Sequence, residues 1–189
     1  MGKFLIAGII QKETIVKIEK LPVRYKKLTN CNETIFSDIG GDAYNEANAL
    51  EWLGNEVRLL SLIGEEDEYL IDTLGLDSRY VLPVLKRTPA AVVFYDEHRK
   101  QQTFLDIKDL SEVSYEPELF EKAMEDVDMV ILSNEEFCRP LLKKVKETMS
   151  LIQNNMFLKS ILNGSNKTVK EFKSQKKSLK KLNKSLVKE

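Results

Sequence analysis

The sequence predicts an α/β protein in which a parallel β-sheet is flanked by helices and carries a small antiparallel β lid. Apolar runs of strand length alternate with helical patterns along the chain, which is typical of a parallel sheet. The runs Lys3–Ile10, Val57–Ile63 and Val127–Leu132 are apolar on both faces, as strands in the middle of such a sheet are. Two further β-rich segments interrupt the alternation and predict the lid.

The helices are predicted from the spacing of apolar residues. Ala43, Ala47, Leu50 and Leu53 recur at helical intervals within Gly40–Gly54 and mark a buried face, and the small alanines allow close packing on a sheet. Two more helices are expected at Pro117–Asp126 and Arg139–Thr148.

The lid is predicted from the segments Thr14–Ile39 and Ala90–Ile107. The first contains short extended pieces, and the second contains two β-rich runs joined by a polar turn, which is the pattern of a hairpin. Both segments look antiparallel, so we expect them to form a small separate sheet above a ligand.

Composition divides the chain near residue 150. Residues 1–150 contain 28 acidic and 19 basic side chains, whereas residues 151–189 contain 10 lysines and 2 glutamates. We therefore expect one domain over 1–150, with lid segments at about 14–39 and 88–107, and a basic low-complexity tail over 151–189 that is helical or disordered. The acidic body argues against nucleic acid as a partner, since phosphate binding needs a basic face.

Several other classes of site are excluded or disfavoured. The single histidine, His98, excludes a histidine pair or a multi-histidine metal site. Cys31 and Cys138 have no metal-type spacing and are expected to be free thiols. The consecutive acidic residues Glu65–Asp67 are expected to form a solvated turn, because neighbouring side chains diverge. Without a signal pattern or an apolar run near 18 residues, the protein is expected to be cytoplasmic and not to bind membranes.

A ligand site is predicted where Gly40 and Gly41 open the helix. Glycine lets the backbone turn sharply and lets a ligand approach, and the N–H groups of the first helical turn face the same space. Asn45 and Asn48 add both donors and acceptors without positive charge. This mixture favours a neutral ligand rich in hydroxyl groups.

Gln11 and Glu13 are expected to complete this site. They alternate with their neighbours, so they share one face where the first strand ends. Ligands of open α/β sheets lie beyond the carboxyl ends of the strands, and a carboxylate there accepts hydroxyl groups of a sugar.

These motifs together resemble the N-terminal half of the ribokinase-like (PfkB) family of carbohydrate and nucleoside kinases. The resemblance covers about residues 3–148 and rests on four segments in order: Gly8–Glu13, Gly40–Gly54, Val57–Asp67, and Thr88-Pro89 with the hairpin after it. It implies a partial ribokinase-like domain and transfer of the γ-phosphoryl group of ATP to a hydroxyl group of a sugar or nucleoside.

The resemblance also assigns residues and partners. Gln11, Glu13, Gly40, Gly41 and Asn45 would hold the hydroxyl groups, although the family usually has aspartate at the position of Glu13. Asp42 beside the glycine pair, and Asn134 at the end of the third strand, would border the ligand. ATP and magnesium are the cofactors that the full-length family implies, and pairing of two subunits through the lid is implied by many relatives.

The catalytic half of the family is missing from the sequence. Its second signature, Asp-Thr-x-Gly-Ala-Gly-Asp, supplies a phosphate-binding helix start and the aspartate that deprotonates the hydroxyl group. Asp72–Asp77 is one residue too short to match and precedes the lid hairpin, so Gly75–Asp77 is interpreted as a link toward the lid. We therefore predict no catalytic residue, no metal ligand and negligible turnover by this chain alone.

Three interpretations follow. The first is a truncated sugar kinase, such as a gene fragment whose tail is read from a shifted frame, as the change near Ser150 suggests. The second is a catalytically dead sugar-binding or regulatory subunit that pairs through its lid. The third is a subunit that another chain completes.

Overall fold

The structure, a computed structural model, describes residues 1–28, 31, 33, 35–98 and 100–148. The chain divides into two units, Met1–Lys144 and Val145–Glu189, and only residues 145–148 of the second are described. The predicted tail over 151–189 therefore lies outside the described residues. Among the helices that are described, none is long and apolar enough to span a lipid bilayer.

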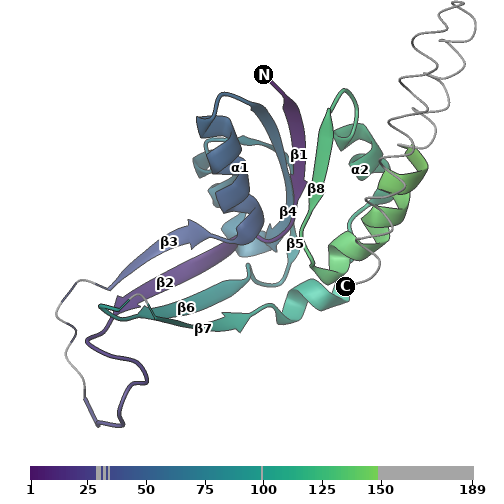
Figure 1. Cartoon of the computed structure of the whole chain (residues 1–189). Coiled ribbons are helices and arrows are strands. Elements are labelled where there is room, and N and C mark those ends of the chain that lie inside the picture. The colour runs from purple at the N-terminus through teal and green to yellow at the C-terminus, as the bar shows by residue number, and fades with distance from the viewer. Residues whose placement is uncertain (29–30, 32, 34, 99, 149–189) are drawn as a thin grey trace, which may run out of the picture. The chain divides into compact units, whose positions relative to one another are not determined.

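The larger sheet is entirely parallel and has the strand order β5-β4-β1-β8 (Figure 1). Its strands are β1 (Lys3–Ala7), β4 (Glu56–Gly64), β5 (Asp77–Leu85) and β8 (Met129–Leu132). The central strands β1 and β4 have buried side chains on both faces, including Leu5, Ile6, Leu59 and Leu60. The parallel α/β architecture that the apolar runs predict is confirmed.

Helices cover both faces of this sheet (Figure 1). Helix α1 (Asp42–Trp52) buries Ala43 and Ala47 in one cluster with Leu59 and other apolar side chains of the sheet. The expectation for Leu53 is wrong, because the helix ends at Trp52 and the Leu53 side chain is 75% exposed. Helix α2 (Pro117–Ala123) lies on the opposite face, where the Arg58 guanidinium donates a hydrogen bond to the carbonyl oxygen of Ala123 at 3.0 Å. Arg58 and Leu59 point to opposite faces because side chains alternate along a strand. A third helix spans residues 139–148.

Strand β5 is the element that the sequence analysis missed. Its first residue, Asp77, was assigned to a link toward the lid, and Pro83 within the strand lowers its β character. The strand lies at the edge of the sheet, where a proline is tolerated because one side of the strand makes no ladder bonds. The connection from β4 to β5 is the 3₁₀ segment Glu65–Thr73 and not an α-helix. The alternation of helix and strand patterns therefore does not predict β5.

The smaller sheet forms the lid and has the order β3-β2-β6-β7. Its strands are β2 (Gln11–Lys17), β3 (Phe36–Gly40), β6 (Ala90–Tyr95) and β7 (Gln101–Asp106). The β2–β3 and β6–β7 pairs are antiparallel as expected, but β2 and β6 run parallel, so the lid is a mixed sheet. The reason is that β2 and β6 both leave the larger sheet in the same direction, after β1 and β5 respectively.

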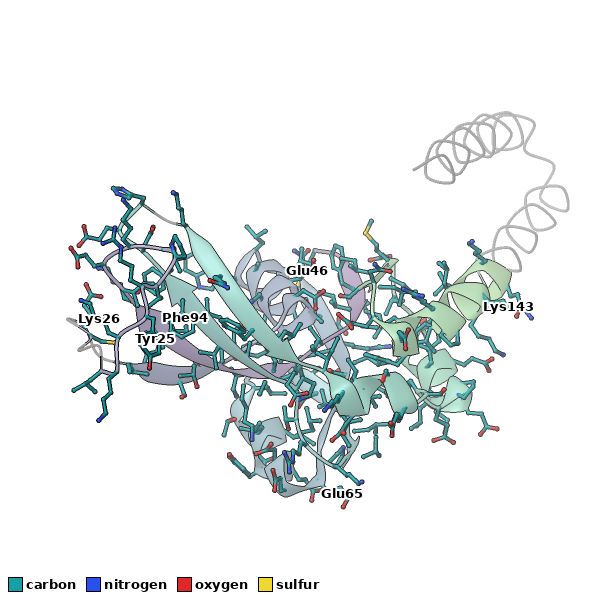
Figure 2. All side chains as sticks on the ribbon, turned by 90° about the horizontal axis from the view of Figure 1, so that it is seen from below. Tyr25, Lys26, Glu46, Glu65, Phe94 and Lys143 are labelled. Atoms are coloured by element: carbon teal, nitrogen blue, oxygen red, sulfur yellow. The ribbon has the colours of Figure 1, made fainter. Side chains whose placement is uncertain are left out.

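A buried carboxylate holds the far end of the lid together. Tyr25 and Lys26 lie at this end near Phe94, opposite Lys143 at the other end of the unit (Figure 2). Asp96 accepts hydrogen bonds from the backbone N–H groups of Leu21, His98 and Lys100, at 3.1, 2.9 and 3.0 Å. Although burial raises the pKa of Asp96, these hydrogen bonds outweigh it and leave the pKa below its ordinary value.

An ion pair joins the lid to the 3₁₀ segment Glu65–Thr73 that follows β4. The Lys12 ammonium on β2 lies 2.7 Å from a carboxylate oxygen of Asp67, which is buried. The Thr88 hydroxyl group, also buried, accepts a hydrogen bond from the Gly64 N–H at 2.9 Å. The expectation of a solvated acidic turn is therefore met by Glu65 and Glu66, which are exposed, and is wrong for Asp67.

Candidate functional site

The site lies where the chain passes from β1 into the lid. β1 ends at Ala7 and not at Ile10, because the N–H groups of Ile9 and Ile10 donate to the side chains of Asp42 and Ser61, at 3.3 and 3.2 Å. The chain then turns into β2. Gln11 and Glu13 consequently belong to the lid, and not to the end of the first strand as predicted.

Gln11, Glu13 and Gly40 form one continuous polar surface on the lid. Gln11 is paired with Gly40 across the β2–β3 ladder, and the Gln11 amide donates to a Glu13 carboxylate oxygen at 2.6 Å. The Glu13 carboxyl group lies against Gly40 so closely that a Cβ at residue 40 would collide with it. Gly40 is thus the position that lets Glu13 fold over β3 and face α1.

Gly41 makes the turn from the lid into helix α1. Its φ angle is 103°, which strongly favours glycine, and a Cβ there would collide with the backbone oxygen of Ile9. This close approach fixes the start of α1 beside the end of β1. The sharp turn predicted from the glycine pair is therefore present, and its cause is backbone-to-backbone packing.

The start of α1 is occupied by Asp42. One Asp42 carboxylate oxygen accepts hydrogen bonds from the N–H groups of Ala43, at 2.7 Å, and Ile9, at 3.3 Å. The expectation that the first-turn N–H groups are free for a ligand is therefore wrong for Ala43. An acidic group in the first turn is favoured by the helix dipole, and it leaves this helix start unsuited to a second anion.

Asn45 faces an open cleft between α1 and the lid. The cleft has a volume of about 530 Å³. Its lining residues are Gln11, Glu13, Ile15, Phe36, Asn45, Val93, Tyr95, Gln101 and Thr103. The structure thus brings Gln11, Glu13 and Asn45 to one space. Asn48 instead donates a hydrogen bond to the carbonyl oxygen of Tyr44 in its own helix, at 2.9 Å.

A second acidic group lies at the end of β8, and the sequence analysis did not select it. Burial, together with the negative charge of Asp42, raises the pKa of Glu135 above its ordinary value. Burial and the charges of Glu135 and Asp42 also raise the pKa of the Cys138 thiol to about 12. Asn134 is exposed, and neither it nor Asp42 is among the residues that line the cleft. The feature of the sequence that could have identified Glu135 is its position directly after Asn134, at the carboxyl end of a predicted strand.

This donor set does not suit a nucleoside triphosphate or a metal ion. The Asp42 carboxylate holds the start of α1, and its negative charge repels phosphate. In the part of the chain that is described, no group of three or more His, Cys, Asp or Glu side chains could hold a metal ion. The amides and carboxylate of the cleft instead match the hydroxyl groups of a neutral polyol.

Comparison with known proteins identifies relatives of similar fold. The model of the pfkB family of carbohydrate kinases matches residues 12–182. A microbiome-derived acarbose kinase is 18% identical, with a TM-score of 0.67 over 78% of this chain and 50% of that one. No curated protein sequence matches the chain.

Two further solved structures are similar. A nucleoside kinase from Burkholderia thailandensis, in complex with inosine, is 26% identical, with a TM-score of 0.57 over 71% of this chain and 45% of that one. Ribokinase from Arabidopsis thaliana, complexed with ribose and ATP, is 17% identical, with a TM-score of 0.54 over 70% and 45% of the two chains. The chain spans about half the length of the solved structures it matches.

Proposed function

Because this chain belongs to the pfkB family of carbohydrate kinases, we propose that it supplies the sugar-binding half of an ATP-dependent carbohydrate kinase. The observation that carries this proposal is the position of the Glu13 carboxyl group, which lies against Gly40 and lines the same cleft as Asn45. It places an acceptor carboxylate on the lid, opposite the Asn45 amide on α1.

The roles of the side chains follow from their chemistry. One Glu13 oxygen accepts the Gln11 amide, and this hydrogen bond orients the carboxylate so that the other oxygen is available for a sugar hydroxyl group. Asn45 supplies a donor and an acceptor from the helix side. Asp42 holds the start of α1, and neither it nor Asn134, which follows β8, lines the cleft. The bound sugar in the inosine complex, a ribose, has hydroxyl groups of the kind that such a set recognises.

The same proposal includes negligible phosphoryl transfer by this chain alone. Phosphoryl transfer depends on groups that position the phosphates and neutralise their developing charge. The 189 residues lack the late Asp-Thr-x-Gly-Ala-Gly-Asp signature, and the helix start beside the cleft is acidic. In a full-length family member, bound ATP would supply the transferred phosphoryl group, and bound magnesium would neutralise its negative charge.

Pairing of two copies through the lid is the proposed assembly. A second hollow of about 750 Å³ lies between the lid and the 3₁₀ segment, with Tyr69, Val92 and Phe104 among its lining residues. Val92 and Phe104 are 37% and 58% exposed on it, and the Phe104 ring packs edge-to-face with Phe94 at a centroid distance of 6.0 Å. Apolar surface of this kind favours covering by a partner surface.

The test is binding of ribose and release of ADP by the purified chain. We expect ribose to raise the melting temperature without ADP release. Replacing Glu13 by Ala should weaken ribose binding about 10- to 100-fold, because hydrogen bonds to a charged group are lost. The matched control is Glu51→Ala, since Glu51 is exposed on α1 and does not line the cleft.

Two outcomes separate the proposal from its alternative. Restored ADP release on adding a separate chain with the late signature would favour a kinase half, whereas ribose binding that is never coupled to ADP release would favour a sugar-binding or regulatory subunit. ADP release by the chain alone would contradict the proposal.

A further inference from the structure

The loop after β2 has a tip whose charge is opposite to that of the rest of the domain. This tip, residues 20–28, contains four cationic side chains and no acidic one: Lys20, Arg24, Lys26 and Lys27. All four are exposed, and none forms an ion pair with another residue that the structure describes. Because residues 1–150 contain 28 acidic and 19 basic side chains, the tip is a local reversal of charge.

The same tip exposes apolar side chains. Tyr25 is 97% exposed, Leu28 78% and Val23 48%. Single apolar side chains are ordinary on a protein surface, but a group of them usually marks a contact with a partner or a membrane. Apolar and cationic residues are mixed from Val23 to Leu28, so both kinds of side chain are concentrated in one short stretch.

The base of the loop is fixed, and the tip lies at the end of the lid. Leu21 is buried, and its N–H group donates to the Asp96 carboxylate at 3.1 Å. Figure 2 shows Tyr25 and Lys26 at the end of the lid, and Figure 1 shows this loop extending beyond the ends of the lid strands. The tip is therefore a protruding surface, and none of its residues lines the sugar cleft.

The nearest acidic side chains do not neutralise the tip. Glu33 is paired with Lys17 at the end of β2. The β6–β7 turn lies at the same end of the lid, because the His98 and Lys100 N–H groups bind the same carboxylate as Leu21. The charges of Glu97 and Lys100 in that turn cancel. Glu19, directly before the tip, offsets one of the four cations and leaves three.

We propose that this tip binds the surface of an anionic lipid bilayer, with its cations among the headgroup phosphates and with Tyr25 and Leu28 at the boundary of the acyl chains. Long cationic side chains keep their charge in the headgroup region while apolar groups lie deeper, and tyrosine is enriched at that boundary. A protruding tip suits a deformable bilayer, whereas a protein partner would need a pocket to receive the aromatic side chain. The acidic remainder of the domain is repelled by the same surface, so the end of the lid is the part that approaches it.

A hollow within the loop provides room for a phosphate group. It has a volume of about 560 Å³, and Lys20, Arg24 and Lys26 are among its lining residues, together with Glu19. Arginine binds phosphate through two parallel hydrogen bonds, and lysine binds it as a point charge. The three cations outnumber the one carboxylate, so the hollow favours an anion.

This inference is independent of the proposed function, because the tip and the sugar cleft have no residue in common. The sequence-based expectation that the chain does not bind membranes came from the lack of a long apolar run. That pattern argues against a spanning helix, but a surface contact needs only cationic and apolar side chains on one exposed element.

The test is sedimentation of the full chain with vesicles of phosphatidylcholine alone, or of phosphatidylcholine and phosphatidylserine in equal amounts. We expect binding to the anionic vesicles only, and it should weaken as salt is added because salt screens charge. Lys26→Glu combined with Lys27→Glu should reduce this binding about tenfold or more, since each cation near an anionic surface contributes to affinity. The matched control is Lys86→Glu combined with Arg87→Glu, the same change of charge at two exposed residues outside the tip, which should retain most of the binding.

Fluorescence provides a second measurement that reports on the tip itself. Trp52 is the only tryptophan and is 94% exposed, so Trp52→Phe gives a background without tryptophan. Tyr25→Trp in that background should shift its emission to shorter wavelength with anionic vesicles. Binding through the ten lysines of residues 151–189 would leave this emission unchanged.

Several outcomes would overturn the membrane assignment. These are no binding to anionic vesicles, equal binding to both kinds of vesicle, equal losses in the two double variants, or unshifted emission of Tyr25→Trp. Displacement of the chain from vesicles by soluble polyglutamate, with unshifted emission, would assign the tip to an acidic protein instead. Ribose affinity and melting temperature should be the same in all these variants as in the wild-type chain, so failure of this inference leaves the sugar-binding proposal intact.

Discussion

The carboxyl group of Glu13 occupies the space beside Gly40 where any other residue would place its first side-chain carbon. This relationship joins two strands of the lid and presents the proposed sugar-binding carboxylate toward α1. A Cβ at residue 40 would collide with the end of the flexible Glu13 side chain and not with backbone. A substitution of Gly40 should therefore disturb ligand binding more than folding.

Gly40→Ala is expected to impair binding with little effect on stability. The new methyl group would displace the Glu13 carboxylate, which rotates away without moving the backbone. Ribose affinity should fall at least tenfold, while the urea midpoint of unfolding changes little. Calorimetry and urea unfolding measure the two effects. Retained ribose affinity would show that Glu13 does not act from its position beside Gly40.

Gly41→Ala should have the opposite profile, with a large loss of stability. Its Cβ would meet the backbone oxygen of Ile9, which has no free rotation to yield, and φ is 103°. A destabilisation of about 1–3 kcal/mol or more is expected. Gly75→Ala is the control, because Gly75 has φ of 70° with open space around it and reports the cost of φ alone. Equal unfolding midpoints for the two variants would contradict the proposed collision.

The sequence was sufficient to predict the turn at Gly41 and the burial of Ala43 and Ala47 on α1, because these depend on local backbone requirements and helical spacing. It was wrong for Leu53, which lies just past the end of the helix and is exposed. It was insufficient for β5, since Pro83 is compatible with a strand only at a sheet edge, and edge position is a property of the assembled sheet. The parallel β2–β6 pair was missed for a similar reason: strand direction depends on where each strand leaves the larger sheet.

The candidate site, like the fold, was predicted only in part. Alternation correctly grouped Gln11 with Glu13 on one face, and Asn45 proved to face the same cleft. The proximity of Glu135 to Asp42 joins residues far apart in the chain, and no local pattern reveals it. Likewise Asp67 stands among exposed acidic neighbours in the sequence, and its partner Lys12 comes from the lid, 55 positions earlier in the chain.

Asp67→Asn is expected to weaken the junction between the lid and the 3₁₀ segment Glu65–Thr73. The variant should lose about 1–2 kcal/mol of stability near neutral pH, less than for a fully buried pair, because the Lys12 side chain is 43% exposed. Glu65→Gln, an exposed neighbour, should change stability by less than about 0.5 kcal/mol. Urea unfolding of both variants at pH 7 measures the difference, and equal losses would contradict the role of the pair.

The pH dependence of the same pair has a defined sign. Burial raises the pKa of Asp67, but Lys12, Thr88 and Tyr69 together outweigh burial and lower the pKa below its ordinary value of 3.8. The carboxylate therefore contributes stability above about pH 4, and this contribution is lost as the pH falls through the lower folded-state pKa. The wild-type chain should lose its stability advantage over Asp67→Asn on acidification. An advantage that is constant down to pH 2 would exclude Asp67 as the titrating group.

Phe104→Glu is expected to prevent pairing of two copies through the lid. Phe104 is 58% exposed on the face away from the sugar cleft, and a carboxylate there would be desolvated in any interface that covers this face. Analytical ultracentrifugation should show a dimer for the wild-type chain and a monomer for Phe104→Glu, with ribose affinity unchanged in both. Tyr25→Glu introduces the same charge at the end of the lid and should remain dimeric. A wild-type chain that is monomeric at about 100 µM, or a variant that still dimerises, would show that this apolar face is not the pairing surface.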